Sequence, residues 1–562
     1  MISTGDFAIL CVFAIARLVS AKYSIIPDCD EVFNYWEPLH FLTHGFGAQT
    51  WEYSPEFAIR SWAYLWAHGV AIKLSELILS FTGLQPKYFI FYGLRTVFAT
   101  VCVLSDFALY RSAKKNLSGS IAVGYAVISA TSTGMFHASV AFLPSTFAMN
   151  CVTLAISQFL NISPTGFVGS YCRGFVLIAV AGILGWPFAL AVGAPFGLYY
   201  LFNITRPNAF VGLLKALMAI GTIAGITLAI DSVSYRSLQL GTLNIVLYNV
   251  FGGEGQGPEI FGVEDWKYYL HNLLLNFNIA YPLSIMAFVT PVLFYLLPAS
   301  STSLRVHPAR LALTTSPLLL WSAIFYLQPH KEERFFYVVY QLIALSAAIS
   351  LEWISAVVHA VGLKGLKTFT IAVALSGIAS ISILRSVSLA QNYSAAIHVL
   401  KTPQLYEGEG TTFCLGREWY RFPSSYFLAP HQRLRFVKSG FKGLLPTSFE
   451  ESENPNMWWD LPGTSSIPLH MNNLNLEAPE LYVEPSQCDF VVDIDIPANS
   501  EEGEISYFTS PDWKKINCRK FLDFESSGPG KLLWLPESLH GLTKTNLKHH
   551  DYCLFEKVKD KK

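Results

Sequence analysis

Four carboxylates lie within ten residues in the segment from Asp28 to Pro38, which reads DCDEVFNYWEP. Aromatic side chains are interleaved with them, and an apolar stretch comes directly before. A carboxylate at the boundary of a low-dielectric phase has a raised pKa, which suits a general base. Two other interpretations remain open. The D-x-D pattern offers oxygen ligands to a divalent ion, and a solvated acidic loop beside interfacial aromatics has the same composition.

A basic cluster, QPHKEERFF at residues 328–336, opens a later apolar stretch. Pro329 suits the first turn of a helix. Helical spacing then puts Lys331 and Arg334 on one face, with His330 beside Arg334. Together with the helix N-terminus, these donors predict an anion site at the depth of lipid headgroups. The alternative is that the charges snorkel and only anchor a membrane span.

Two further stretches suit the wall or lid of a site. Gln49–Pro55, followed by Arg60, contains Trp and Tyr faces that suit sugar rings. Asn244–Trp266 contains the glycine-rich run 252–257. This run lacks the strand–turn–helix context of a nucleotide-binding loop, so we reject a nucleotide site and expect a flexible loop.

The composition shows what must position these motifs. Of 562 residues only 14% are charged, against about 25% in a typical soluble protein, while 52% are hydrophobic and the mean hydropathy is +0.38. The 39 basic and 40 acidic residues nearly balance, so no global field recruits a polyanion. These values exclude a disordered chain, a coiled coil and a basic nucleic-acid binder. They indicate a polytopic membrane protein.

Eleven apolar stretches qualify as transmembrane helices, which need roughly 20 residues. They are 5–22, 88–109, 119–137, 145–160, 173–186, 188–203, 209–230, 281–298, 311–327, 336–358 and 368–388. The fourth to sixth are short, so merged or re-entrant segments remain open there. The segment 57–80 is also apolar but carries Arg60, His68, Lys73 and Glu76. We predict an interfacial amphipathic helix for it.

Lysines and arginines in the short loops predict the orientation. They follow the second span (Arg111, Lys114, Lys115) and precede the seventh (Arg206), the ninth (Arg305, Arg310) and the eleventh (Lys364, Lys367). With eleven spans these loops share one face, which the positive-inside rule assigns to the cytosol. The first span disagrees locally, because Asp6 precedes it while Arg17 and Lys22 lie toward its other end.

The expected organisation is a membrane module at 1–389 with longer lumenal loops at 23–87 and 231–280, followed by a lumenal domain at 390–562. Short apolar runs such as 490–492, with Pro and Gly between them, predict strands and turns in this tail, and hence a mixed α/β domain.

Cysteines and sequons of the chain bear on this topology. Four tail cysteines, Cys414, Cys488, Cys518 and Cys553, permit two disulfides in three connectivities. The Asn392 sequon is expected on the lumenal side, whereas those at Asn116, Asn161 and Asn203 fall on the cytosolic side and stay unmodified.

The sequence resembles the dolichyl-phosphate-mannose-dependent mannosyltransferases of glycosyltransferase family 22, in the GT-C class. The resemblance rests on Asp28–Pro38, Gln49–Pro55, Asn244–Phe251 and His330–Phe335, which recur in that order. The tail run REWYRFPSS at 417–425 resembles the subfamily that makes α-1,2 linkages in N-glycan precursor assembly. The resemblance therefore spans most of the chain.

This resemblance implies a GT-C-type fold with about eleven transmembrane helices, in a multi-pass enzyme of the endoplasmic reticulum membrane whose active site is lumenal. The implied donor is dolichyl phosphate mannose. The implied acceptor is a lipid-linked oligosaccharide on dolichyl diphosphate, which would receive its seventh and ninth mannose. Donor and acceptor are both membrane-anchored, and neither a cofactor nor a nucleic acid is expected.

The roles of the motif residues follow from the implied reaction. A β-linked donor and an α-linked product imply one inverting displacement, which needs one base. We expect Asp30 to be this base, with Asp28 and Glu31 as nearby alternatives. His330, Lys331 and Arg334 are expected to compensate the phosphate charge, which makes a metal unnecessary. The expected substrate-binding residues are Tyr35, Trp36, Glu37, Trp51, Glu52, Tyr53, Arg60, Asn244 and Tyr248.

Two rival functions are weighed against this one. A transporter or lipid scramblase would place ionisable residues near the bilayer midplane, whereas here they cluster at one face. A sister mannosyltransferase would make another linkage or act on glycolipid anchors. The tail motif at 417–425 argues against the sister enzyme, but loop shape decides acceptor choice.

Overall fold

The computed structural model describes residues 3–81, 87–161, 166–252, 257–305, 307–452, 457–539 and 546–558. The chain forms two compact units, neither of which is continuous in sequence. Unit 1 comprises Met1–Ala21, Thr96–Thr227 and Phe261–Ser386, and unit 2 comprises Lys22–Arg95, Leu228–Ile260 and Val387–Lys562. The expected loop 23–87, most of the loop 231–280 and the expected tail thus fold as one unit.

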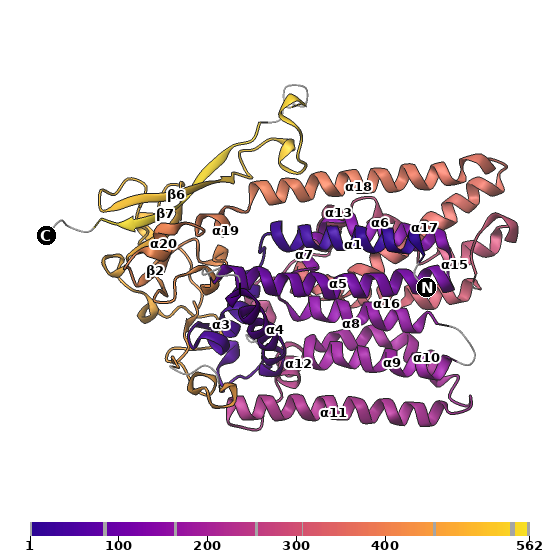
Figure 1. The fold of residues 1–562 in the computed structure, drawn as a ribbon, viewed down its shortest axis with the longest axis horizontal. Helices are drawn as coiled ribbons and strands as arrows, with labels where there is room; N and C mark the ends of the chain where they lie inside the picture. Colours follow the sequence, from indigo (N-terminus) through magenta and orange to yellow (C-terminus); the bar gives the residue numbers. More distant parts are fainter. Residues whose placement is uncertain are drawn as a thin grey trace. The chain divides into compact units, whose positions relative to one another are not determined.

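Unit 1 is a helical bundle whose long helices run side by side (Figure 1). Its helices, some of which continue into unit 2, are α1 (Thr4–Tyr23), α5 (Tyr88–Asn116), α6 (Gly119–Thr131), α7 (Thr133–Ala138), α8 (Pro144–Phe159), α9 (Phe167–Val180), α10 (Ala194–Leu201), α11 (Ala209–Tyr235), α13 (Lys267–Phe277), α14 (Ala280–Met286), α15 (Thr290–Leu293), α16 (Pro308–Leu327), α17 (Tyr340–Ala360) and α18 (Lys367–Asn392).

All eleven predicted spans fall on helical segments. Within the described ranges, seven helices are long and apolar enough to cross a membrane by themselves. They are Thr4–Tyr23, Tyr88–Asn116, Phe167–Gly185, Ala209–Tyr235, Pro308–Leu327, Glu333–Ala360 and Lys364–Asn392. The stretches 119–137, 145–160, 188–203 and 281–298 are helical but shorter or interrupted. A multi-helical membrane protein is thereby confirmed, and the count of eleven stays a prediction.

The interruptions have local causes. Ser132 leaves the helical conformation (φ −56°, ψ 135°) and separates α6 from α7. Trp186 is extended and precedes Pro187, so α9 and α10 do not merge into one helix. The stretch 281–298 is divided among α14, α15 and a short 3₁₀ turn at Phe294–Leu296.

Burial differs strongly among the long helices. In Glu333–Ala360, 72% of an 18-residue apolar stretch is buried inside the protein. This segment therefore lies at the centre of the bundle. The corresponding fractions are 11% for α11 and 17% for α18. A helix that is apolar on every side yet mostly exposed meets lipid in a membrane protein. We therefore assign α11 and α18 to the lipid-facing periphery of unit 1.

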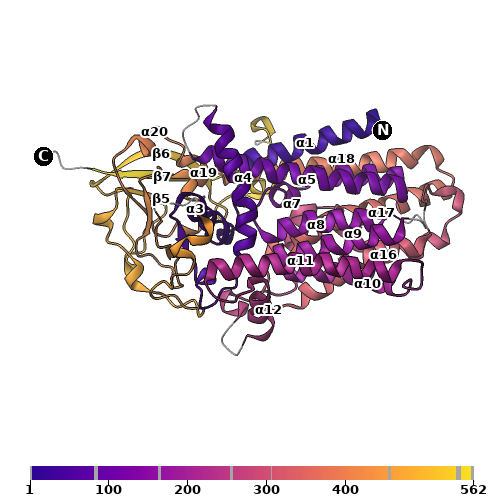
Figure 2. The ribbon, with the colours of Figure 1, turned by 60° about the horizontal axis from the view of Figure 1, so that its bottom comes forward.

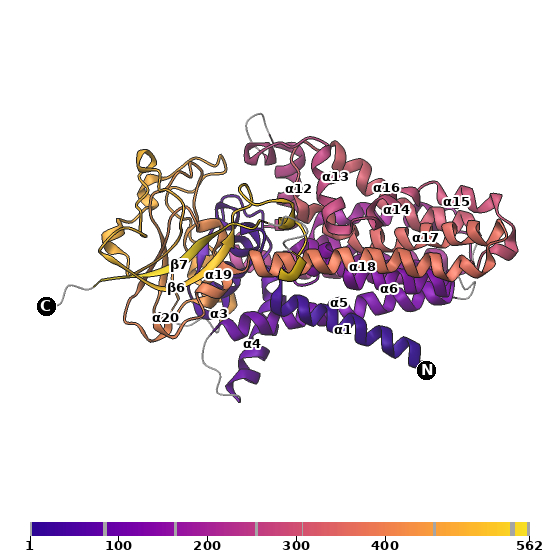
Figure 3. The same cartoon turned by 90° about the horizontal axis from the view of Figure 1, so that it is seen from above.

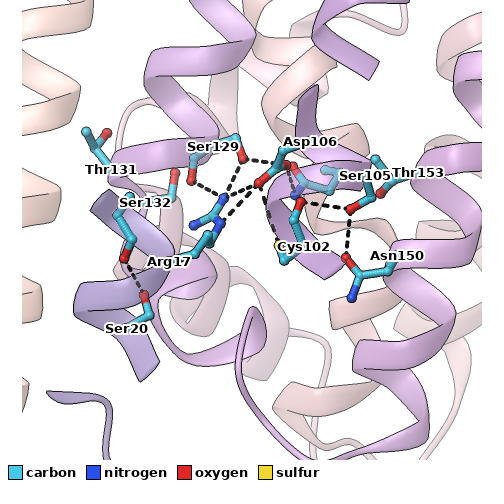
Figure 4. Close-up of polar contacts among 12 residues, drawn as sticks. Arg17, Ser20, Cys102, Ser105, Asp106, Ser129, Thr131, Ser132, Asn150 and Thr153 are labelled. Atoms are coloured by element: carbon cyan, nitrogen blue, oxygen red, sulfur yellow. Dashed lines mark hydrogen bonds and ion pairs between the residues drawn. The ribbon is translucent and has the colours of Figure 1, made fainter. Parts of the chain in front are cut away.

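A buried ion pair joins α1 to α5 and α6 inside unit 1 (Figure 4). Arg17 donates from Nε and Nη2 to Asp106 Oδ2 at 3.0 and 2.8 Å. Arg17 Nη2 also donates to the carbonyl and hydroxyl oxygens of Ser129, at 3.0 and 2.8 Å. Tyr125 donates to Asp106 Oδ1 at 2.9 Å. Arg17 is only 1% exposed, so it lies inside the bundle and not in a loop. It therefore no longer counts against the orientation that the other loops predict for the first span.

Unit 2 contains a five-stranded sheet with the order β3-β2-β5-β7-β6. Three of these strands, β5, β7 and β6, are labelled next to one another in Figure 2. Its strands are β2 (Thr412–Leu415), β3 (Arg433–Phe436), β5 (Phe490–Ile494), β6 (Trp513–Leu522) and β7 (His549–Lys557). Strand β2 runs parallel to β3 and β5, while β7 pairs antiparallel with β5 and with the long β6. Figure 3 shows β6 and β7 next to each other. The strands predicted for the tail, including 490–492, are confirmed.

Two disulfides hold this sheet together and settle the connectivity that was open. Cys414–Cys488 joins β2 to the residues before β5, and Cys518–Cys553 joins facing positions of β6 and β7. Asn392 is the last residue of α18 and is 8% exposed. Its side chain donates to Ser388 Oγ at 3.1 Å and lies 3.3 Å from His549 Nε2. This burial disfavours glycosylation there.

The remaining elements of unit 2 surround the predicted motifs. They are α2 (Cys29–Glu31), α3 (Glu37–His44), α4 (Trp62–Ser80), α12 (Gly241–Phe251), α19 (Ala395–Val399), α20 (Pro403–Glu407), and the paired strands β1 (Ala48–Gln49) and β4 (Thr447–Ser448). The expected amphipathic helix 57–80 begins later, at Trp62. Asp231 binds the Ser61 hydroxyl and the Ala63 N–H, which fixes the start of α4.

Candidate active site

The acidic segment forms the beginning of a continuous helical stretch. Asp28 is the N-cap of α2 and accepts the N–H of Asp30 at 2.9 Å. The helix continues through a π-helical turn at Val32–Trp36 into α3. Asp28, Cys29 and Asp30 are all half-buried, so their side chains reach the surface of unit 2. Helix capping thus presents two carboxylates to solvent on a rigid element.

Glu31 differs from its two acidic neighbours because it is buried, at 1% exposed. Its Oε1 accepts Trp36 Nε1 at 3.0 Å, which fixes both side chains. Arg95 interacts electrostatically with Glu31 and donates to the carbonyl of Ser24, just before the motif, at 2.8 Å. Glu31 and Trp36 therefore shape the segment from inside, and Asp30 and Asp28 are the more accessible carboxylates.

Glu37, expected to bind substrate, is fully buried (0% exposed). Its carboxylate accepts the backbone N–H of Ala48 at 3.0 Å and of Ser425 at 2.6 Å. The hydroxyls of Ser424 and Ser425 donate to it at 3.1 and 2.8 Å. Burial raises the pKa of Glu37, and the four donors act against that rise. We correct its role to a structural one: it ties α3 to the tail motif.

Tyr35, Glu52 and Arg60 form one polar network. Arg60 Nε donates to Glu52 Oε2 at 2.7 Å, and Arg60 Nη1 donates to the hydroxyl of Tyr35 at 2.6 Å. Burial acts to lower the pKa of Arg60, but the charge of Glu52, the hydrogen bond to it and the charge of Asp30 outweigh burial and raise that pKa. Arg60 is thus a fixed cation within electrostatic range of Asp30.

Three residues that sequence reasoning missed hold the backbone at Arg60. The hydroxyl of Tyr235 donates to the Arg60 carbonyl at 2.7 Å. Asp231, fully buried, accepts Ser61 Oγ at 2.9 Å and the Gly241 N–H at 3.2 Å. A Cβ at Gly241 would lie 2.7 Å from the carbonyl of Arg60, so this close approach requires glycine. A lone aspartate in the apolar stretch that forms α11 was the available signal.

The other aromatic candidates pack inside unit 2. Tyr53 is fully buried and donates to the carbonyl of Asn34 at 2.8 Å. Trp51 is 7% exposed and contacts the half-buried Tyr248, with ring centroids 5.2 Å apart. Asn244 donates to the carbonyl of Ala58 at 3.0 Å. The rings of Trp51 and Tyr53, expected to stack on sugars, are therefore buried against other protein side chains, which corrects that expectation. Tyr248 and Asn244 are half-buried and remain accessible in part.

The glycine-rich run falls largely outside the residues that the structure describes. Residues 253–256 are not among them, so the expected loop is described only at Gly252 and Gly257. Before it, Asn244–Phe251 is helical and lies within α12.

The tail motif 417–425 packs directly on the acidic segment within unit 2. Phe33 contacts Trp419 and Phe422, with ring centroids 5.9 and 6.4 Å apart. Arg417 makes a bidentate ion pair with Asp493 of β5, at 2.7 and 3.1 Å. Through these contacts and through Glu37, the five-stranded sheet supports the helical stretch that carries Asp30.

The basic cluster of unit 1 is not helical where a helix was expected. Residues 328–332 are irregular, and a 3₁₀ turn begins only at Glu333, ahead of α17. The side chains explain this difference. His330 Nδ1 lies 2.8 Å from the carbonyl of Gly262, and Lys331 Nζ donates to the carbonyls of Glu264 (2.7 Å) and Gln328. These bonds hold the segment against residues 262–264.

The basic side chains nevertheless gather, because Glu332 links two of them. Its Oε1 lies 2.8 Å from His330 Nε2, and its Oε2 lies 2.5 Å from Arg334 Nη2. Burial acts to lower the pKa of His330, but the bond with Glu332 prevails and raises that pKa. An incoming phosphate would therefore share His330 and Arg334 with a resident carboxylate.

The D-x-D pattern also brings possible metal ligands together. A ligand atom from each of Asp28, Cys29 and Asp30 lies within 4.8 Å of the others. Two carboxylates and a thiol form a mixed donor set, because hard cations prefer oxygen and thiolate suits softer metals. One of these carboxylates also has a structural task, because Asp28 accepts the N–H of Asp30 as the N-cap of α2.

The chain is similar to known proteins over most of its length. The sequence profile of the Alg9-like mannosyltransferase family matches residues 8–429. The chain is 36% identical to α-1,2-mannosyltransferase alg9 of Schizosaccharomyces pombe over 528 residues, which cover 91% of this chain and 89% of that protein. It is 34% identical to α-1,2-mannosyltransferase ALG9 of Saccharomyces cerevisiae over 569 residues, covering 98% and 97%. The family resemblance expected from the motifs is confirmed.

A solved structure also resembles this fold. ArnT from Cupriavidus metallidurans, in a crystal structure bound to undecaprenyl phosphate, aligns with a TM-score of 0.52 at 11% identity. The alignment covers 78% of this chain and 87% of ArnT. At this identity the likeness concerns the fold alone, and it confirms the GT-C-type architecture that was expected.

Proposed function

Because the chain belongs to the Alg9-like mannosyltransferase family, we propose that it is an α-1,2-mannosyltransferase of the endoplasmic reticulum membrane. Its donor is dolichyl phosphate mannose, and its acceptor is a dolichyl-diphosphate-linked oligosaccharide, which receives its seventh and ninth mannose on the lumenal side. The observation that carries this proposal is the similarity to named α-1,2-mannosyltransferases over more than nine-tenths of the chain.

Asp30 acts as the general base in this proposal. It takes the proton of the acceptor hydroxyl while that oxygen bonds to the anomeric carbon, and the bond to the dolichyl phosphate oxygen breaks with inversion. Its support is the half-buried position of Asp30 on a capped helix, with Arg60 within electrostatic range. Arg60 stabilises the charge that Asp30 carries before the proton transfer. Asp28 and Glu31 remain the alternatives.

His330, Lys331 and Arg334 bind the donor phosphate in this proposal. The leaving phosphate is a weak base, so it needs charge compensation more than a proton. Glu332 and the carbonyls of Gln328 and Glu264 hold the three cations in place before a ligand arrives. Such preorganisation lowers the entropy cost of binding.

With three cations available for the phosphate, we propose that transfer is metal-independent. We expect the purified enzyme to keep its full transfer rate after dialysis against excess EDTA. The measurement is mannose transfer before and after chelation, with manganese and magnesium added back separately. A rate that falls with EDTA and returns with either ion would establish Asp28, Cys29 and Asp30 as a metal site instead.

Arg334→Lys should weaken donor use although it preserves the charge. A guanidinium grips phosphate oxygens bidentately while an ammonium acts as a point charge. One charge-assisted hydrogen bond is worth roughly 1.5–3 kcal/mol, so we expect about a 10- to 100-fold loss in kcat/KM for the donor, and a larger loss in Arg334→Ala. The measurement is initial rate against donor concentration at saturating acceptor.

The matched control is Arg310→Lys, because Arg310 is a half-buried arginine of the same unit that donates to Tyr171 at 3.1 Å. It should leave donor kinetics unchanged. If Arg334→Lys and Arg334→Ala also keep wild-type donor kinetics, the cluster only anchors the span and the phosphate partner lies elsewhere.

The choice of donor gives a direct test of the proposed function. The purified full-length chain is incubated with lipid-linked acceptor and either dolichyl phosphate mannose or GDP-mannose. We expect transfer from the lipid-linked donor alone. Transfer from the nucleotide sugar, or from neither donor, would refute the proposal.

A further inference from the structure

A cavity in unit 1 has no part in the proposed reaction. It measures about 510 Å³, within the range of sites for small ligands, and its lining includes Asp6, Arg111, Lys114, Lys115 and Arg305. Four basic side chains thus face one carboxylate, which leaves the lining with a net charge of +3. Such a cavity attracts an anion.

The cavity lies at the termini of α1 and α5, which are long and apolar enough to cross a membrane. Asp6 is in the first turn of α1, Lys114 and Lys115 are in the last turn of α5, and Ser157 and Gln158 of the lining are in the last turn of α8. The ends of transmembrane helices lie at the depth of lipid headgroups. The loop charges predict that this end faces the cytosol, where anionic lipids are most abundant.

Three of the four basic side chains are held in place by contacts within the unit. Asp6 Oδ1 accepts Lys114 Nζ at 2.6 Å and the hydroxyl of Tyr110 at 3.1 Å, and Asp6 Oδ2 lies 3.5 Å from Arg111 Nη1. Arg305 donates to the carbonyls of Lys114 and Lys115 at 3.0 and 3.3 Å. Arg305 therefore covers the negative end of the α5 dipole, which would otherwise repel an anion.

Neutral donors complete the lining. Ser112, Asn116 and Gln158 border the same cavity. The Ser112 hydroxyl donates to the carbonyl of Ser157 at 2.7 Å, and the amide of Gln158 complements the oxygens of a phosphodiester and of a polyol headgroup. Charges that only set the topology need no cavity and no amide neighbours. We infer that this pocket binds the phosphate group of an anionic glycerophospholipid from the cytosolic leaflet, and so it is a lipid site distinct from the proposed donor site.

Binding to the full-length protein in detergent tests this inference. The probes are short-chain phosphatidylinositol, short-chain phosphatidylcholine and inorganic phosphate, with bound lipid counted by native mass spectrometry and affinity taken from thermal shifts. We expect one phosphatidylinositol per chain, bound at least tenfold more tightly than phosphatidylcholine. Equal affinity for the two lipids would overturn the inference, and phosphate binding as tightly as phosphatidylinositol would exclude a lipid as the preferred ligand.

Charge removal gives the second arm of the test. Lys115 is exposed and Arg111 is 41% exposed at its side chain, so neutralising them leaves the Lys114–Asp6 pair intact. We expect phosphatidylinositol affinity to fall about fivefold in Lys115→Gln and about 25-fold in Arg111→Gln/Lys115→Gln. The control Lys364→Gln removes an exposed lysine that does not line the cavity and should bind normally.

Two results of this arm would count against the site. Wild-type affinity in the double variant would overturn it, and so would an equal loss in Lys364→Gln, since the lipid would then respond to general surface charge. If the double variant has a lower melting temperature than the wild type without lipid, the affinity of Lys115→Gln alone decides the test, because the Lys115 side chain is exposed. Mannose transfer is not the readout, so failure here leaves the proposed function untouched.

Discussion

Asp30→Asn should lower the rate of mannose transfer by about 10²- to 10⁴-fold, the usual cost of losing a general base. The fold should survive, because the helix beginning at Cys29 is capped through the Asp30 N–H and the Asp28 side chain, both of which remain. Donor binding should also survive, because the phosphate cations are unaffected. The measurement is single-turnover transfer together with binding of dolichyl phosphate mannose by the purified variant.

Two companion variants make this result specific to Asp30. Glu56→Gln removes an exposed carboxylate of the same loop and should transfer mannose at the wild-type rate. Asp28→Asn keeps an acceptor for the N-cap bond and should cost much less than Asp30→Asn. Near-normal turnover in Asp30→Asn, with a collapse in Asp28→Asn or Glu31→Gln, would transfer the role of base to that other carboxylate.

Arg17→Met should destabilise the protein by about 3–5 kcal/mol, because it leaves the buried Asp106 carboxylate without its cation. The double variant Arg17→Met/Asp106→Leu should recover much of that loss, since removing both members of a buried pair costs far less than removing one. The measurement is the unfolding free energy, or the melting temperature, of each variant in the same detergent.

The control for this pair is Arg173→Met in α9. Arg173 is hydrogen-bonded to Gln158 at a largely exposed site, so its loss should cost well under 1 kcal/mol. Wild-type stability in Arg17→Met, or a double variant that is less stable than Arg17→Met, would contradict this explanation.

Sequence periodicity and composition predicted the elements of this protein well. The apolar stretches all became helices, and the tail formed the expected mixed sheet. The reason is that burial in lipid and alternation in strands leave patterns that are local in sequence. The prediction was wrong where side chains decide, as at residues 328–332. There His330 and Lys331 bind distant carbonyls, and the helix starts at Glu333 rather than Pro329.

The sequence predicted which motifs form the candidate site, but not which of their residues are accessible and which are buried. Asp30 and Glu37 look alike in sequence, yet one is half-buried and the other is fully enclosed by four hydrogen-bond donors. No spacing rule separates them, because three of the four donors come from Ser424 and Ser425, almost 400 residues away. Asp231 escaped notice for the same reason: its partners near Arg60 are about 170 residues distant.

One measurement tests most directly whether this chain transfers mannose in α-1,2 linkage from a lipid-linked donor to a lipid-linked oligosaccharide. The purified chain is reconstituted with dolichyl phosphate [³H]mannose and acceptors of defined structure, and each labelled product is digested with an α-1,2-specific mannosidase. We predict transfer to acceptors that lack the seventh or the ninth mannose, with all label released by the enzyme. Label that resists this digestion, or no transfer to either acceptor, would contradict the account.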